Sequence, residues 1–170
     1  MALVCTPLAY ASACRGVIAT DISPLMLGHA TRSLSGLPNV STRVADAVST
    51  GLPAESADVV VAVNLLHIVP DALAVLTEVR RLLRPGGLAV LVVGTGQGLS
   101  ARKALTSMVR FLRRWGPMRE KGQQSLTQQT LEALVRQAGL DVVEGKLLTG
   151  NAMNAAFVRA TKPTRGAQAT

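Results

Sequence analysis

Residues 57–93 read ADVVVAVNLLHIVPDALAVLTEVRRLLRPGGLAVLVV and carry the clearest pattern of secondary structure in the chain. The almost continuous apolar run 57–63 is typical of a strand buried on both faces. Apolar residues at helical spacing follow Asp71, and the Pro and Gly residues of 84–87 end that helix. A second apolar run, 88–93, predicts another buried strand. Strand, helix and strand in this order predict a βαβ unit and a mainly parallel sheet.

The flanking sequence extends the same pattern. Upstream, residues 16–21 and 40–45 read as two short strands, and Ser23 followed by Pro is a typical start for the helix between them. Downstream, helices are expected at 100–115 and 127–138, the second with Gly139 as its cap. The last two strands are expected at residues 140–148 and 154–160, antiparallel to each other if residues 149–151 form the turn.

The totals indicate one globular domain. At 170 residues and 48% apolar content, the chain has enough apolar surface for a core, which Val, Leu, Ala and Met must build because aromatic residues are only 2%. We expect the domain to span 1–161 and residues 162–170 to form a flexible tail. No apolar run reaches the ~20 residues of a membrane span, and no signal peptide is evident. Cys5 and Cys14 indicate neither a disulfide framework nor a metal site, so a cytoplasmic protein without metal is expected.

The net charge of +8 is local. Residues 1–99 contain six Lys or Arg and six Asp or Glu, whereas residues 100–121 contain seven basic residues and one acid. A basic amphipathic helix at 100–115 is typical either of an ordinary surface helix or of a lid that contacts a membrane surface. Charge alone does not indicate specific nucleic-acid binding, and the oligomeric state is not predicted.

Polar residues end three of the predicted strands: Asp21, Asp46 and Asn64. Ligands of open α/β sheets bind beyond the carboxyl ends of the strands. A carboxylate there can accept hydrogen bonds from ribose hydroxyls or from a nucleobase. An acid at a strand end is equally typical of a turn or a helix cap, so the order of the three residues carries more weight than any one of them.

Five segments together resemble the class I S-adenosylmethionine-dependent methyltransferases, in their type 11 branch. These segments are 19–27 (ATDISPLML), 44–47 (VADA), 52–60 (LPAESADVV), 64–71 (NLLHIVPD) and 82–88 (LLRPGGL). The resemblance covers residues 16–98 well and 126–160 loosely. It implies an α/β fold with a Rossmann-like, doubly wound sheet that is mostly parallel and has an antiparallel C-terminal hairpin strand.

The resemblance also implies S-adenosylmethionine as cofactor and assigns roles to single residues. By that resemblance, Asp21 binds the ribose, Ile22 lies against the adenine, Asp46 and Ala47 contact the adenine edge, and Asn64 lines the methionine side. His67 follows closely and is a candidate for substrate contact, or a histidine that only leads into the next helix. The implied reaction is methyl transfer, accelerated by positioning and desolvation. Our first hypothesis for the acceptor is a small molecule, and the lid alternative for residues 100–115 favours a lipophilic one.

One departure from the family pattern keeps alternatives open. The family's first strand and glycine-rich turn should precede Asp21, but the chain has no glycine before Gly16. Either residues 2–5 form a short substitute strand, or the first strand is missing and the chain is a truncated product. Without the glycine loop, activity is uncertain. A second hypothesis is therefore an inactive methyltransferase-like relic that acts as a partner or regulatory module, and a third is an NAD-binding domain.

Overall fold

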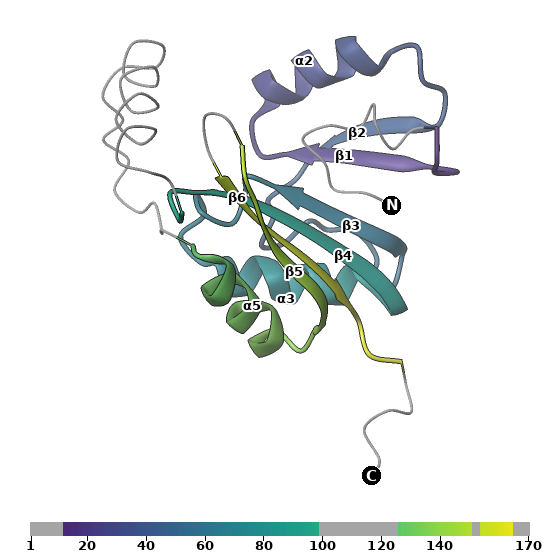
Figure 1. Ribbon diagram of the computed structural model, residues 1–170. Coiled ribbons are helices and arrows are strands. Elements are labelled where there is room, and N and C mark those ends of the chain that lie inside the picture. Colours follow the sequence, from purple (N-terminus) through teal and green to yellow (C-terminus); the bar gives the residue numbers. More distant parts are fainter. Residues whose placement is uncertain (1–11, 99–125, 151–153, 165–170) are drawn as a thin grey trace, which may run out of the picture.

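The computed structural model describes residues 12–98, 126–150 and 154–164 (Figure 1). In chain order the elements are β1 (Val17–Asp21), α2 (Pro24–Leu34), β2 (Val40–Val44), β3 (Ala57–Val63), α3 (Ala72–Leu82), β4 (Leu83–Thr95), α5 (Gln128–Gln137), β5 (Asp141–Leu148) and β6 (Asn154–Thr161). Each predicted strand and helix in this part of the chain is confirmed. The helix predicted at 100–115 lies outside the described residues.

The main sheet has four strands in the order β3-β4-β6-β5. Strands β3 and β4 are parallel, and β6 is antiparallel to both of its neighbours, β4 and β5. Helices α3 and α5 lie against one face of this sheet (Figure 1). This arrangement confirms the predicted α/β fold with an antiparallel C-terminal hairpin.

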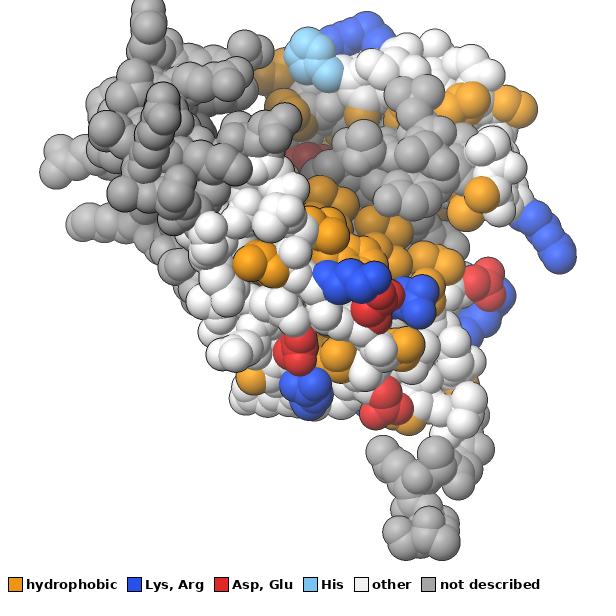
Figure 2. Space-filling view, in the orientation of Figure 1, with side chains coloured by type: hydrophobic (Ala, Val, Ile, Leu, Met, Phe, Trp, Pro, Cys, Tyr) orange, Lys and Arg blue, Asp and Glu red, His pale blue; other side chains and the backbone are white. Residues whose placement is uncertain are grey.

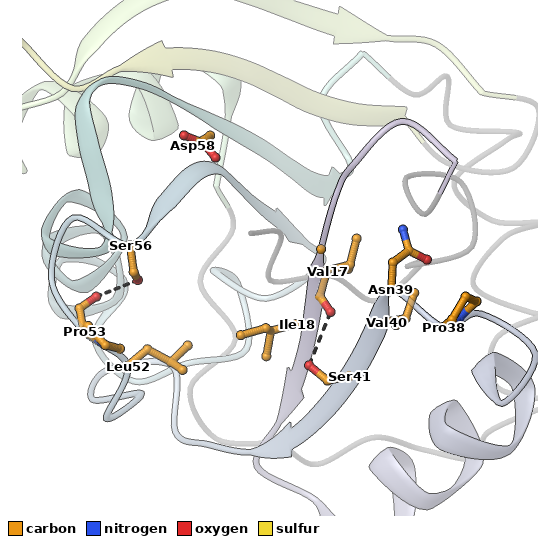
Figure 3. A pocket seen from close by; sticks show the side chains of 11 residues that line it. Val17, Ile18, Pro38, Asn39, Val40, Ser41, Leu52, Pro53, Ser56 and Asp58 are labelled. Atoms are coloured by element: carbon orange, nitrogen blue, oxygen red, sulfur yellow. Dashed lines mark hydrogen bonds between the residues drawn. The ribbon is translucent and has the colours of Figure 1, made fainter.

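Strands β1 and β2 form a separate, parallel, two-stranded sheet. Among the described residues no strand pairs between β1 and β3, and the two sheets meet through the side chains of Val17 and Val61, each 1% exposed. A cavity of about 500 Å³ opens at the amino ends of β1, β2 and β3, where the sheets separate (Figure 3). The break lies where the resemblance places the family's first strand, and residues 2–5, the predicted substitute, lie outside the described residues.

The main core lies between the four-stranded sheet and helices α3 and α5. Its fully buried side chains include Leu76 of α3, Leu91 of β4 and Leu131 of α5. The inward face of α3 buries Leu76, Val79 and Leu82 of the predicted apolar stripe, whereas Leu73 is only partly buried. The same face also buries Ala72, Val75 and Glu78, and Glu78 is 7% exposed. A charged side chain on that face needs polar partners, and these are Thr50 of a distant loop and Arg81 of the same helix.

Local sequence explains the ends of the helices. The side chains of Ser23, Asp71 and Thr127 accept hydrogen bonds from backbone N–H groups in the first turns of α2, α3 and α5. Gly139 follows α5 with φ of +76°, a conformation that glycine adopts without strain. These caps place all three helix starts within one residue of their predicted positions.

Strand β4 begins earlier than predicted because Leu83 already pairs with Ala57 before the turn at 84–87 interrupts the ladder. Gly86, with φ of +77°, makes that turn and donates its N–H to the Lys162 carbonyl oxygen at 2.8 Å. The Lys162 ammonium in turn donates to the Leu83 carbonyl oxygen at 2.8 Å. Lys162, the first residue of the predicted tail, is therefore anchored to the domain, and residues 165–170 lie outside the described part.

Within residues 12–98, 126–150 and 154–164, no helix is long and apolar enough to cross a membrane. The same ranges hold no group of three or more His, Cys, Asp or Glu side chains arranged to bind a metal ion.

Candidate functional site

A cavity of about 670 Å³ lies at the carboxyl ends of β1, β2 and β3. Its described lining is mostly apolar and comes from these three strand ends and from the segment that leads into α3. The lining residues are Thr20, Asp21, Ile22, Ala45, Asp46, Ala47, Val48, Val61, Ala62, Val63, Asn64, Leu65, Ile68, Val69, Pro70 and Asp71. All five residues predicted to bind the cofactor therefore line one cavity, as expected for strand ends that meet at one edge of a sheet.

Asp21 ends β1 and is partly buried. Its Oδ1 accepts a hydrogen bond from the backbone N–H of Ser23 at 2.8 Å, which orients the carboxylate at the start of α2. The backbone carbonyl of Asp21 accepts the N–H of Ala45 at 3.1 Å and so ties β1 to the end of β2. Ile22 lies at the rim of the cavity with 66% of its surface exposed.

Asp46 makes a tight turn directly after β2. Its Oδ1 accepts the N–H of Val48 at 3.0 Å, and its carbonyl oxygen accepts the N–H of Ser49 at 3.1 Å. These bonds use one carboxylate oxygen and leave the residue exposed at the cavity, with Ala47 partly buried beside it. The side chain of Asp46 is thus both a turn former and a candidate for ligand contact.

Asn64 has a second task that sequence reasoning did not predict. Its φ is +53°, its N–H donates to the Val92 carbonyl oxygen at 2.7 Å, and its Oδ1 accepts the N–H of Gly94 at 3.0 Å. These bonds tie the end of β3 to the end of β4. Asn tolerates the left-handed backbone conformation better than most residues, which gives a local reason for an Asn at this strand end.

His67 lies in the turn after β3 and is not among the described residues that line the cavity. Its Nδ1 is buried and makes no hydrogen bond within the described part of the chain. Burial lowers the pKa of the imidazole below its ordinary value of 6.5, so His67 is neutral at neutral pH. Its contact with a substrate stays a prediction.

Two structural features near the cavity were not predicted from the sequence. Asp71 lines the cavity while its Oδ1 caps α3 through the Ala74 N–H at 2.9 Å. Glu78 binds the loop that follows the cavity-lining turn: its Oε1 accepts a hydrogen bond from the Thr50 hydroxyl at 2.6 Å. The sequence pattern that could have revealed this role is a Glu within the apolar stripe of α3. Arg81 follows three residues later, a spacing that places Glu78 and Arg81 on one face of the helix.

The described lining carries three carboxylates, Asp21, Asp46 and Asp71, and no basic side chain. A negative, mostly apolar cavity favours a neutral or cationic ligand over an anionic one. On the molecular face shown in Figure 2, the basic and acidic side chains of the described residues intermingle and form no broad single-sign patch there.

Sequence comparison identifies the family. The pattern of the family described as a methyltransferase domain matches residues 3–91, which is more than half of the chain. A methyltransferase of Penicillium decumbens, calH, is 42% identical over 72 residues, which cover 40% of this chain and 20% of that protein. A highly reducing polyketide synthase of Alternaria alternata, ACRTS2, is 38% identical over 81 residues, which cover 45% of this chain and 3% of the synthase. The chain thus spans a fifth or less of the length of these curated relatives.

Solved structures agree on the fold. A Methanosarcina mazei S-adenosylmethionine-dependent methyltransferase superposes with a TM-score of 0.72 at 21% identity, covering 93% of this chain and 87% of that one. The trans-methyltransferase CalH, solved with S-adenosylhomocysteine, gives 0.67 at 27% identity, covering 86% and 42%. The [4+2]-cyclase SpnF gives 0.76 at 15% identity, covering 96% and 74%, so the fold alone does not specify methyl transfer.

The strand order, the cavity at the strand ends and the family match agree with one another, and they favour a methyltransferase over an NAD-binding domain. The chain belongs to the class I S-adenosylmethionine-dependent methyltransferase family, whose cofactor is S-adenosylmethionine.

Proposed function

We propose that this protein binds S-adenosylmethionine in the cavity at the ends of β1, β2 and β3 and transfers its methyl group to a small, lipophilic acceptor. One observation carries the proposal: Asp21 at the end of β1 and Asp46 in the turn that follows the adjacent parallel strand β2 line the same cavity. When bound, the cofactor supplies an electrophilic methyl group on a sulfonium centre. The residues described below would bind and orient it.

The donors and acceptors present fit the nucleoside half of the cofactor. Asp21 and Asp46 each use Oδ1 for a backbone N–H, which orients the carboxylate and leaves Oδ2 available to ribose hydroxyls or to an adenine amino group. Ile22 and Val48 offer apolar surface to the adenine ring. The negative lining also suits the positive sulfonium charge.

The apolar rim supports a lipophilic acceptor. Ile22, Val48 and Ile68 line the cavity and are 66%, 39% and 50% exposed. Exposed apolar side chains gathered at a cavity mouth are typical of a surface that contacts an apolar ligand. The similarity to a trans-methyltransferase and to polyketide synthases supports a polyketide-like acceptor.

A second candidate function is the inactive relic, acting as a partner or regulatory module. It is favoured by the absence of any glycine among the described residues that line the cavity. Glycines at a helix amino end let a backbone approach its ligand closely. The membrane-contacting lid at 100–115 likewise remains a proposal, because that segment lies outside the described residues.

The decisive experiment is calorimetric titration of the wild type and of Asp21→Asn with S-adenosylhomocysteine. Asn preserves the acceptor for the Ser23 N–H and removes the charge and the second acceptor oxygen. A charged hydrogen bond contributes ~1.5–3 kcal/mol, so affinity should fall by roughly tenfold or more. Asp141→Asn, at the exposed start of β5, is the matched control and should bind normally. An unchanged affinity in Asp21→Asn would count against the assignment.

Thermal unfolding separates the enzyme from the relic. A ligand that binds only the folded state stabilises it by ~2.7 kcal/mol at a hundred times its Kd. The methyltransferase should therefore unfold at a higher temperature with millimolar S-adenosylmethionine. A wild type whose unfolding temperature does not respond would favour the relic.

A further inference from the structure

Glu78 is a buried carboxylate that projects from α3 toward the loop between β2 and β3. It is 7% exposed, and its Oε1 accepts both the N–H of Thr50 at 2.9 Å and the Thr50 hydroxyl at 2.6 Å. Arg81 donates its Nε to Oε2 at 2.6 Å and its Nη2 to Oε1 at 2.8 Å. These four donors satisfy the buried charge, which would otherwise be costly.

The same network reaches further along the loop. Arg81 Nη2 also donates to the Leu52 carbonyl oxygen at 2.6 Å, and the N–H of Leu52 donates to the Thr50 hydroxyl oxygen at 3.3 Å. The N–H of Glu55 donates to the Arg81 carbonyl oxygen at 2.9 Å. Figure 3 shows the Leu52 side chain pointing toward Ile18 of β1. Helix α3 therefore holds this loop at Thr50, Leu52 and Glu55, which lie 26–29 residues from Arg81 or Glu78 in the chain.

The loop begins as a wall of the candidate cofactor cavity. Asp46, Ala47 and Val48 line that cavity, and the turn closes through the Ser49 N–H on the Asp46 carbonyl oxygen. Thr50 follows at once. Upstream, the N–H of Ala45 is bonded to the Asp21 carbonyl oxygen. Only four residues separate Ala45, which is bonded to Asp21, from Thr50, which is bonded to Glu78. The position of the turn between them therefore depends on both contacts.

We propose that Glu78, acting through Thr50, is a positioning residue for nucleoside recognition: it holds the Asp46–Ser49 turn where that turn can contact the adenine. This inference rests on the proposed function. A turn that is ordered only part of the time binds with an affinity reduced by that fraction. The network should therefore affect ligand affinity beyond its effect on stability.

The test compares Thr50→Val and Thr50→Ser with the wild type. Val keeps the shape of Thr50 and its N–H but removes the hydroxyl, whereas Ser keeps the hydroxyl. In Thr50→Val we expect affinity for S-adenosylhomocysteine to fall roughly threefold or more. Amide hydrogen exchange of residues 46–50 should accelerate roughly tenfold, because local opening becomes easier. Thr50→Ser should restore both the affinity and the slow exchange. If Thr50→Val does not fold, Arg81→Lys is the second test, because Lys loses the paired hydrogen bonds from Arg81 to the Glu78 carboxylate.

The matched control is Val158→Ala, which weakens the core at β6, a strand separated from β3 by β4. It should lower stability without changing affinity or exchange in the turn. The inference is overturned if Thr50→Val binds like the wild type, or if Val158→Ala loses affinity to the same extent. If the wild type itself does not bind S-adenosylhomocysteine, the proposed function fails. Unchanged hydrogen exchange of residues 46–50 in Thr50→Val would separately show that the network does not order the turn.

Discussion

Replacing Glu78 with Gln should remove a pH-dependent part of the stability of this protein. Hydrogen bonds from Arg81 outweigh the opposing effect of burial and, with those from Thr50, lower the pKa of the Glu78 carboxyl from its ordinary value of 4.5 to about 2. Because the pKa is lowered on folding, the charged carboxylate stabilises the folded state above about pH 4.5. That contribution is lost as pH falls from about 4.5 toward 2.

The magnitude follows from the size of the pKa change. A lowering from 4.5 to about 2, at 1.36 kcal/mol for each pKa unit, corresponds to roughly 3 kcal/mol. The side chain of Arg81 is 39% exposed, so water screens the pair and the expected value is about 1–3 kcal/mol. Gln keeps the shape of Glu78 and an acceptor for Thr50, which limits other damage.

The assay is urea-induced unfolding, followed by circular dichroism, of both proteins between pH 7 and pH 2.5. The wild type should be more stable at pH 7, and the difference should shrink steadily below about pH 4.5. Glu144→Gln is the control: Lys146 lowers the pKa of the Glu144 carboxyl, but that ion pair lies at the surface. A difference between wild type and Glu78→Gln that is equally large at both ends of the range would refute the reasoning.

Substitutions at three further positions, with matched controls at two of them, test the fold by their unfolding free energies. Gly87→Ala should reduce the free energy of unfolding by about 1–3 kcal/mol, because its Cβ would lie 2.8 Å from the Arg84 carbonyl oxygen and 3.2 Å from that of Asp58. Gly16→Ala is the control and should be nearly neutral, because a Cβ at Gly16 meets no atom of the described residues within 4 Å. Asn64→Ala should be less stable than Asn64→Gly by about 1–2 kcal/mol. Both variants lose the hydrogen bond to the Gly94 N–H, but only Ala is strained at a φ of +53°. Equal stability of the two variants would show that the backbone relaxes. Leu76→Ala, at a fully buried position, should lose about 2–5 kcal/mol, and a loss below 1 kcal/mol would contradict the core assignment.

Much of the fold was predictable because it is encoded locally. The apolar run of β3 and the helical spacing in α3 need only the periodicity of backbone structure, and both elements lie where the pattern places them. Ser23 and Gly139 mark helix ends through contacts within a few residues. The gathering of Asp21, Asp46 and Asn64 at one cavity also follows from a general property of parallel sheets.

The elements of the described residues, the family resemblance and the residues at the strand ends can all be read from the amino-acid sequence alone. The contacts that hold those residues in place depend on the packed structure. The Asn64 side chain bonds Gly94, 30 residues away, and Glu78 bonds Thr50, 28 residues away. Two further findings also depend on the packed structure: among the described residues β1 does not pair with β3, and His67 does not line the cavity. A hydrogen bond between distant segments requires a short distance and a suitable angle between donor and acceptor. The packing of helices and strands sets that geometry, and no local pattern of residues encodes it.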